Sequence, residues 1–153
     1  MEQIKVVFSF DENYSLHGLI AALSLLDSSL NSEEYAVYDL FFVSEYEISL
    51  ALREKFLFYL KKYSNFRSAE FVSSEPGGSR RYESKHLTRA TYLRLELPEL
   101  LDEDRVIYSD VDVLYLSGLK DLWNVEIGDY YVAASLDIGL NPVSYTHLTL
   151  PTT

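Results

Sequence analysis

Asp110 and Asp112 stand one residue apart inside a strongly apolar segment, "RVIYSDVDVLYLSGL" (105–119). The residues on either side of them are typical of a buried strand. A buried carboxylate without a partner costs several kcal/mol, or its pKa shifts until the group is neutral. The pair therefore indicates either a bound ligand or a position outside the core.

Two acids at this spacing could hold a metal ion. In an extended backbone, residues i and i+2 point to the same side, so both carboxylates would meet a ligand together. Such hard oxygen donors suit Mg²⁺ or Mn²⁺, which also bind phosphate oxygens. The ion would neutralise the carboxylates and give an acidic protein a place for an anionic ligand. An exposed bulge or turn with two solvated acids explains the spacing equally well.

The composition excludes several classes of partner and site. The chain has 153 residues, a formal net charge of −11 and no cysteine. The negative charge argues against nucleic acid and against docking of the whole surface onto anionic lipid. The absence of cysteine excludes disulfides and thiolate metal sites. No apolar run approaches the roughly 20 residues of a membrane span, and the acidic start "MEQIKVVFSF" is not typical of a signal peptide.

The elements that must position the acids alternate between strands and helices. "IKVVFSF" (4–10) is a continuous apolar run, as in a parallel strand buried on both faces. The alternation predicts an α/β sandwich with a largely parallel sheet and no domain boundary before residue 140. Strands are expected at 4–10, 35–43, 69–73, 105–109 and 130–135. Helices are expected at 15–30, from the Ser-x-x-Glu box at 44–47 to about residue 63, at 86–97 and, for a turn or two, at 118–123.

Helical boundaries and buried faces follow from local signals. Ser44 and Glu47 form a Ser-x-x-Glu capping box at the start of the second helix, and the third helix is expected to stop near Pro98. Helical spacing predicts these buried positions: Leu16, Leu19, Ile20, Leu23, Leu26 and Leu30 in the first helix, and Ile48, Leu52, Phe56, Tyr59 and Leu60 in the second.

Two of the acids are expected at the same edge of this sheet. Asp11 follows the first strand directly, and Asp110 follows the fourth. In open parallel sheets, ligands bind beyond the carboxyl ends of the strands, at a point where the strand order reverses. If both strands are parallel, the acids lie at the rim where ligands bind, which explains why they need not be buried.

Four segments in order resemble family 8 glycosyltransferases, the retaining group that includes glycogenin and bacterial lipopolysaccharide galactosyl- and glucosyltransferases. They are "VVFSFDENYSLHGLIAALSLL", "HLTRATYLRLELPELL", "VIYSDVDVLYLSGLKDLW" and "YVAASLDIG". The resemblance implies a GT-A type, Rossmann-like nucleotide-binding sandwich. It also implies a UDP-sugar donor, Mn²⁺ or Mg²⁺, and transfer of a hexose, glucose or galactose, to a glycan or lipopolysaccharide acceptor with retention of configuration.

The same resemblance implies roles around the metal. Asp110 and Asp112 match ligands of the metal and diphosphate, and Asp110 also matches a position close to the ribose and sugar of the donor. Arg94 matches a basic residue near the diphosphate, a task that suits its planar fork. Without the resemblance, Arg94 could equally pair with Glu96 or an Asp on the surface.

Further positions match the nucleotide and sugar sites. Asp11, Asn13 and Tyr14 correspond to residues that hold the uracil and ribose, and Tyr14 could stack on the base. Asp137 corresponds to an acid that reaches sugar hydroxyls. The alternatives are structural, because Tyr14 could cover the first helix and Asp137 could cap a turn.

The second half of the family pattern has no counterpart here. An Asn-Ala-Gly segment and a distal His-x-x-Gly-x-x-Lys, which supplies the third metal ligand, are both missing. Residues 1–142 are therefore interpreted as the donor-binding part of a GT-A domain. Residues 143–153, "VSYTHLTLPTT", resemble a translated sequencing adapter and are interpreted as a non-native or disordered tail.

Other functions are compatible with parts of the pattern. The chain could be a non-catalytic fragment or scaffold that binds UDP and metal. A haloacid-dehalogenase-type phosphatase also carries Asp-x-Asp, but after its first strand and followed by Gly-Thr. A nucleotidyltransferase would be expected to have a glycine-rich phosphate loop near residue 11. The expected location is the cytoplasm, with a peripheral position at the inner face of the membrane as an option.

Overall fold

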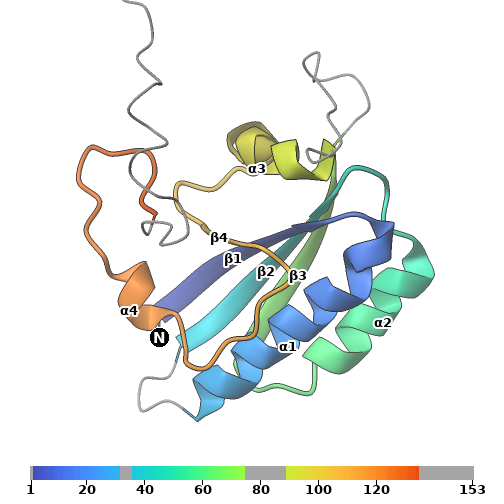
Figure 1. The fold of residues 1–153 in the computed structure, drawn as a ribbon. Coiled ribbons are helices and arrows are strands. Elements are labelled where there is room, and N and C mark those ends of the chain that lie inside the picture. The colour runs from blue at the N-terminus through green and yellow to red at the C-terminus, as the bar shows by residue number, and fades with distance from the viewer. Residues whose placement is uncertain (1, 32–35, 75–88, 135–153) are drawn as a thin grey trace, which may run out of the picture.

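The computed structural model describes residues 2–31, 36–74 and 89–134 (Figure 1). Three expectations lie outside these ranges: Asp137, the tail 143–153 and the predicted start of the third helix. The elements are β1 (Glu2–Phe10), the 3₁₀ turn η1 (Glu12–Tyr14), α1 (Ser15–Leu30), β2 (Ala36–Ser44), α2 (Leu50–Leu60), β3 (Phe66–Ser73), α3 (Arg89–Leu100), β4 (Ile107–Ser109) and α4 (Lys120–Trp123).

The strands form a four-stranded sheet in the order β3-β2-β1-β4. Every pair is parallel, and Phe8 of β1 pairs with Phe42 of β2 on one side and Ser109 of β4 on the other. The predicted α/β class with a parallel sheet is confirmed. The predicted fifth strand is wrong for its described part, because residues 130–134 form no strand.

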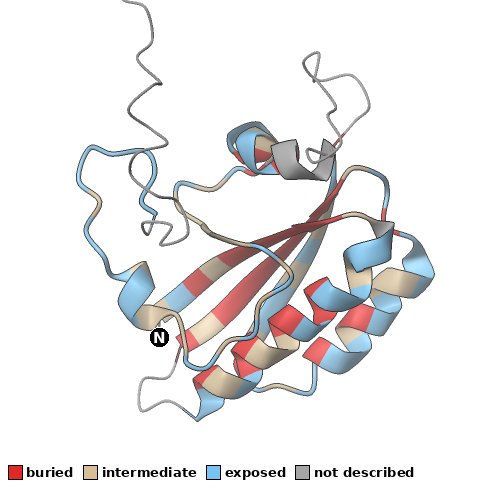
Figure 2. Cartoon of the chain, in the orientation of Figure 1, coloured by how far each residue is buried: buried red, intermediate tan, exposed pale blue. Residues whose placement is uncertain are grey.

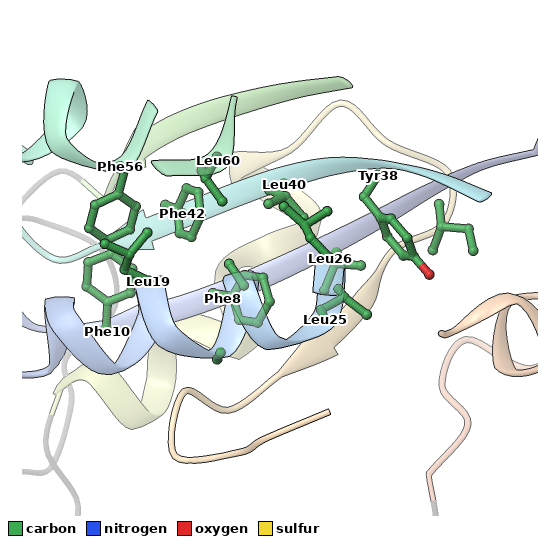
Figure 3. Close-up of a cluster of buried hydrophobic side chains, with 14 of the residues drawn as sticks. Phe8, Phe10, Leu19, Leu25, Leu26, Tyr38, Leu40, Phe42, Phe56 and Leu60 are labelled. Carbon is green, nitrogen blue, oxygen red and sulfur yellow. The ribbon is translucent and has the colours of Figure 1, made fainter. Parts of the chain in front are cut away.

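Helices cover both faces of the sheet (Figures 1 and 2). On one face, α1 and α2 enclose a core rich in phenylalanine, in which the rings of Phe42 and Phe56 are perpendicular with centroids 4.8 Å apart (Figure 3). On the other face, α3 packs Leu97 against Val7 and Phe41. The hydrophobic cluster around Leu97 lies close to the carboxyl ends of the strands. The helix α3 therefore reaches the edge where ligands are expected.

The buried face of α1 differs from the predicted one. Leu19 and Leu26 are buried as expected, but Leu16 is 52% exposed and Ile20 and Leu30 are exposed as well. Ala21, Ala22 and Leu25 take their places in the core. Small residues on this face let the helix approach the sheet closely, and a Cβ atom on Gly18 would lie 2.8 Å from the ring of Phe10.

Two helix boundaries also differ from the prediction. Ser44 ends β2, and α2 is capped instead by Ser49, whose hydroxyl accepts a hydrogen bond from the N–H of Leu52. Phe56 and Leu60 are buried, as predicted, whereas Tyr59 is exposed. Pro98 lies inside α3, which continues to Leu100. The missing N–H of proline removes only one hydrogen bond, and the next turn is closed by Leu101 N–H to Leu97 O.

An ion pair is built into the sheet at Asp39. This aspartate of β2 is only 3% exposed. Arg67 of β3 donates two hydrogen bonds to it, at 2.7 and 2.6 Å, and Ser68 donates a third. The register of β2 against β3 shifts between Tyr38 and Asp39. The three donors compensate the burial of this carboxylate and make it part of the scaffold.

Within the described ranges, no helix has both the length and the apolar character needed to cross a membrane.

Candidate functional site

The carboxyl ends of β1 and β4 bring the predicted acids to one edge of the sheet. The two strands are adjacent and parallel, with Phe8 opposite Ser109. Asp11 follows the end of β1, and Asp110 follows the end of β4. The shared edge predicted for these two acids is therefore confirmed, and it lies where β1 separates the strands β2 and β3 from β4.

A single 3₁₀ turn connects β1 to α1 at this edge. The carboxylate of Asp11 accepts a hydrogen bond of 3.1 Å from the backbone N–H of Tyr14, which fixes the turn. Asn13 is exposed, and the ring of Tyr14 is half-exposed against His17 at a centroid distance of 5.2 Å. Tyr14 therefore does not enter the core.

The two aspartates of the Asp-x-Asp segment lie on the solvent side of the chain. β4 ends at Ser109, and the backbone bends at Val111 and Asp112. Burial still alternates, because Val111 and Val113 pack against the core while Asp110 and Asp112 are exposed. This alternation agrees with the predicted placement of both carboxylates on one side.

The apolar residues that follow are not the buried strand that the sequence indicates. Leu114 is exposed and Leu116 is 95% exposed. The segment runs along α1, where the N–H of Tyr115 donates to the hydroxyl of Ser24 at 3.1 Å. A hydrogen bond from Ser28 to the carbonyl of Ser117 extends this contact.

Asp110 is held by a small network of side chains. The Tyr108 hydroxyl donates to Asp110 Oδ1 at 2.9 Å, and Arg94 Nη2 reaches the same oxygen at 3.3 Å. The guanidinium of Arg94 also lies over the Tyr108 ring, 5.0 Å from its centroid. Behind them, the hydroxyls of Ser9 and Tyr108 are 2.9 Å apart. The structure thus pairs Arg94 with Asp110, which is the surface aspartate pairing that the sequence left open for Arg94.

Tyr108 and Ser9 are site residues that the sequence analysis missed. Tyr108 precedes Asp110 by two residues in or next to β4, so strand alternation places both on the same side. This two-residue spacing is the sequence signal that could have identified Tyr108 as a neighbour of Asp110. The contact with Ser9 depends on the register of β1 against β4, which no local pattern contains.

The surroundings of the Tyr108 hydroxyl raise its pKa. Burial raises the pKa of this phenol above its usual value of 10.0, and the hydrogen bond to Asp110 raises it further. The hydroxyl therefore keeps its proton at neutral pH and donates a hydrogen bond to the carboxylate.

Three carboxylate oxygens remain open at the edge. Within the described ranges, no side chain or backbone group donates to Asp110 Oδ2 or to either oxygen of Asp112. The same ranges contain no cluster of three or more His, Asp or Glu side chains suited to a metal ion. Two exposed carboxylates fit Mg²⁺ or Mn²⁺, which keep several waters and share their remaining positions with phosphate oxygens.

Comparisons with known proteins agree with this arrangement. Residues 5–149 match the sequence profile of "Glycosyl transferase family 8". "Probable galacturonosyltransferase-like 4" of Arabidopsis thaliana is 30% identical over 140 residues, which are 87% of this chain and 38% of the relative. General stress protein A of Bacillus subtilis (strain 168) is 42% identical over 60 residues, 37% of this chain and 21% of that protein.

A solved structure shows the same fold. The crystal structure of the galactosyltransferase LgtC in complex with donor and acceptor sugar analogs matches with a TM-score of 0.70 and 30% sequence identity, over 88% of this chain and 47% of LgtC. The predicted GT-A type fold is therefore confirmed.

The chain spans about half or less of the length of these relatives. The profile match includes residues 143–149, so a non-native origin of the tail stays a prediction. The match also decides against the phosphatase and nucleotidyltransferase alternatives. The chain belongs to glycosyltransferase family 8.

Proposed function

We propose that this chain is the donor-binding half of a metal-dependent, retaining glycosyltransferase. The enzyme transfers a hexose, glucose or galactose, from a UDP-sugar to a glycan or lipopolysaccharide acceptor. One observation carries the proposal: in a family 8 fold, Asp11, Asp110, Asp112 and Arg94 gather at the carboxyl edge of β1 and β4.

The turn after β1 binds the nucleoside. Asp11 and Asn13 offer polar groups for the uracil and ribose, and the half-exposed ring of Tyr14 offers a stacking surface for the base. Because the Asp11 carboxylate is already tied to the turn by the N–H of Tyr14, the nucleoside meets a fixed group. Such preorganisation reduces the entropy lost on binding.

The segment after β4 binds the charged part of the donor. Asp110 and Asp112 would hold Mn²⁺ or Mg²⁺, and the bound ion would stabilise the charge of the departing UDP. Arg94 lies next to Asp110 and would contact the diphosphate through its planar fork. Asp137, which lies outside the described residues, is proposed to bind sugar hydroxyls. The proposed location is the cytoplasm, with a peripheral position at the inner face of the membrane when the acceptor is lipid-linked.

A second candidate is a chain that binds UDP and metal without transferring sugar. It is favoured by the described part of the site, in which no group of three or more His, Asp or Glu side chains is arranged to hold a metal ion. Binding is common to both candidates, and only turnover separates them.

The test measures binding and turnover in the same samples. UDP is titrated calorimetrically into the full chain with Mn²⁺ and with EDTA, and hydrolysis or transfer of UDP-glucose and UDP-galactose is followed by mass spectrometry. We expect Mn²⁺ to strengthen UDP binding, and Asp112→Asn to abolish that gain. Turnover supports the transferase, binding alone supports the second candidate, and UDP binding unaffected by Mn²⁺ contradicts both.

A further inference from the structure

We propose that Tyr108, anchored by Ser9, is a positioning residue that holds Asp110 Oδ1 and thereby presents Oδ2 to the cation. The inference rests on the proposed function, because it assigns a task to residues behind the metal site.

Two donors converge on one oxygen of Asp110. Tyr108 donates to Oδ1 at 2.9 Å and Arg94 reaches the same atom at 3.3 Å, while Oδ2 has no donor among the described residues. A carboxylate on an exposed segment would otherwise rotate among several orientations. Holding one oxygen fixes the direction in which the other points, and a fixed ligand binds a metal with a smaller loss of entropy.

Tyr108 has a rigid base for this task. It lies in the three-residue strand β4, and its ring packs against the cluster of Val7, Phe41 and Leu97. Its hydroxyl is 2.9 Å from that of Ser9 on the neighbouring strand. A hydroxyl both donates and accepts, so Ser9 can donate to Tyr108 while Tyr108 donates to Asp110. The chain of hydrogen bonds thus runs from β1, an inner strand of the sheet, to the carboxylate.

Arg94 and Tyr108 differ in what they can do when the donor binds. Arg94 has a side chain that is 42% exposed, and it carries the charge that the diphosphate requires. If Arg94 turns toward the phosphates, Tyr108 is left as the donor to Oδ1. The Tyr108 phenol has no charge that would draw it to the phosphates. It therefore maintains the orientation of Asp110 with and without the bound donor.

The test measures two affinities of each variant: the affinity for Mn²⁺ with UDP bound, and the affinity for UDP without metal. Binding of Mn²⁺ to the full chain with saturating UDP is followed by the loss of the free Mn²⁺ signal in electron paramagnetic resonance. We expect Tyr108→Phe to weaken Mn²⁺ binding about tenfold or more, as for other partners of metal ligands. We expect Ser9→Ala to weaken it about two- to tenfold, as for loss of one hydrogen bond. UDP affinity in EDTA should be unchanged in both variants.

A double variant and a matched control complete the design. If Ser9 acts through Tyr108, Ser9→Ala should add no further loss in the Tyr108→Phe background. Tyr38→Phe is the control, because the Tyr38 hydroxyl bonds to Ser29 and to the N–H of Leu119, away from the carboxyl edge. It should lower stability and leave Mn²⁺ affinity unchanged.

The outcomes separate the inference from the proposed function. If the unmodified chain binds Mn²⁺ with UDP, Asp112→Asn abolishes this, and Tyr108→Phe binds like the unmodified chain, the positioning role alone is overturned. It is also overturned if Tyr108→Phe weakens UDP binding in EDTA by the same factor, since that indicates a general structural defect. If the unmodified chain binds no Mn²⁺ with UDP, the inference and the proposed function fall together.

Discussion

Asp110 and Asp112 are chemically identical residues with different surroundings. Asp110 accepts hydrogen bonds from Tyr108 and Arg94, whereas Asp112 is exposed and accepts none from the described residues. The first carboxylate therefore takes part in holding the structure together, and the second is available only to a ligand. This difference predicts that the two acids respond differently to the same substitution.

Asp112→Asn should leave the fold intact and remove metal-dependent binding. A surface substitution without lost partners changes the free energy of unfolding by at most about 0.5 kcal/mol. Asp110→Asn should cost more, about 0.5–1.5 kcal/mol for each hydrogen bond that is weakened. Urea unfolding in EDTA measures both values. Equal destabilisation by the two substitutions would contradict the network around Asp110.

Tyr115 predicts a loss of stability at alkaline pH. Burial raises the pKa of its phenol above 10.0. Between the ordinary and the raised pKa the folded chain retains a proton that the unfolded chain has released, so stability falls as pH rises through this range. Urea midpoints at about pH 8 and about pH 11 should differ less in Tyr115→Phe than in the unmodified chain. An equal difference in both would show that other groups cause the loss.

At the scale of the element, the contact between α1 and β1 depends on a single glycine. A Cβ atom on Gly18 would lie 2.8 and 2.9 Å from two ring atoms of Phe10. That ring is buried between Phe42 and Phe56, with centroid distances of 6.1 and 6.0 Å, so it has little room to move. The helix that follows the turn Glu12–Tyr14 therefore lies close to β1 because Gly18 has no side chain.

Gly18→Ala should destabilise the chain despite the better helix propensity of alanine. The propensity gain is at most about 1 kcal/mol, and overpacking a filled core costs about 1–3 kcal/mol. We expect a net loss of about 1 kcal/mol in urea unfolding. Asp27→Ala, an exposed position on the same helix, is the control and should be neutral or slightly stabilising. A gain of stability in Gly18→Ala would show that the Phe10 ring can move to make room for the added methyl group.

Elements with a strong local pattern were predictable, and those that need a distant partner were not. β1, β2 and α1 follow from apolar runs and helical spacing, and the shared edge of Asp11 and Asp110 follows from parallel topology. The run "YYVAAS" has the composition of a strand, but residues 130–134 pair with none of the described strands. The bonds among Ser9, Tyr108 and Asp110 depend on strand register, which a single segment does not encode.

At the scale of the whole molecule, much of the described chain after β4 is exposed (Figure 2). Leu116 is 95% exposed and Tyr131 is 100% exposed, and Leu114, Tyr130 and Val132 are exposed as well. Large apolar side chains exposed to water favour association between molecules. The net charge of −11 acts against association between copies, because like-charged molecules repel.

The apolar attraction and the charge repulsion together predict self-association that increases with salt concentration. Raising the ionic strength shortens the range of the charge repulsion to about 3 Å at 1 M and leaves the apolar attraction in place. The weight-average mass in sedimentation equilibrium should therefore rise with both protein and salt concentration. The double substitution Leu116→Ser with Tyr131→Ser should reduce this rise. Leu50→Ser, at an apolar position of α2 that is also exposed, is the matched control and should have a smaller effect. An equal effect of both would show that the association is not specific to Leu116 and Tyr131. A constant mass at all salt concentrations, where the repulsion is screened, would show that the exposed apolar side chains do not drive association.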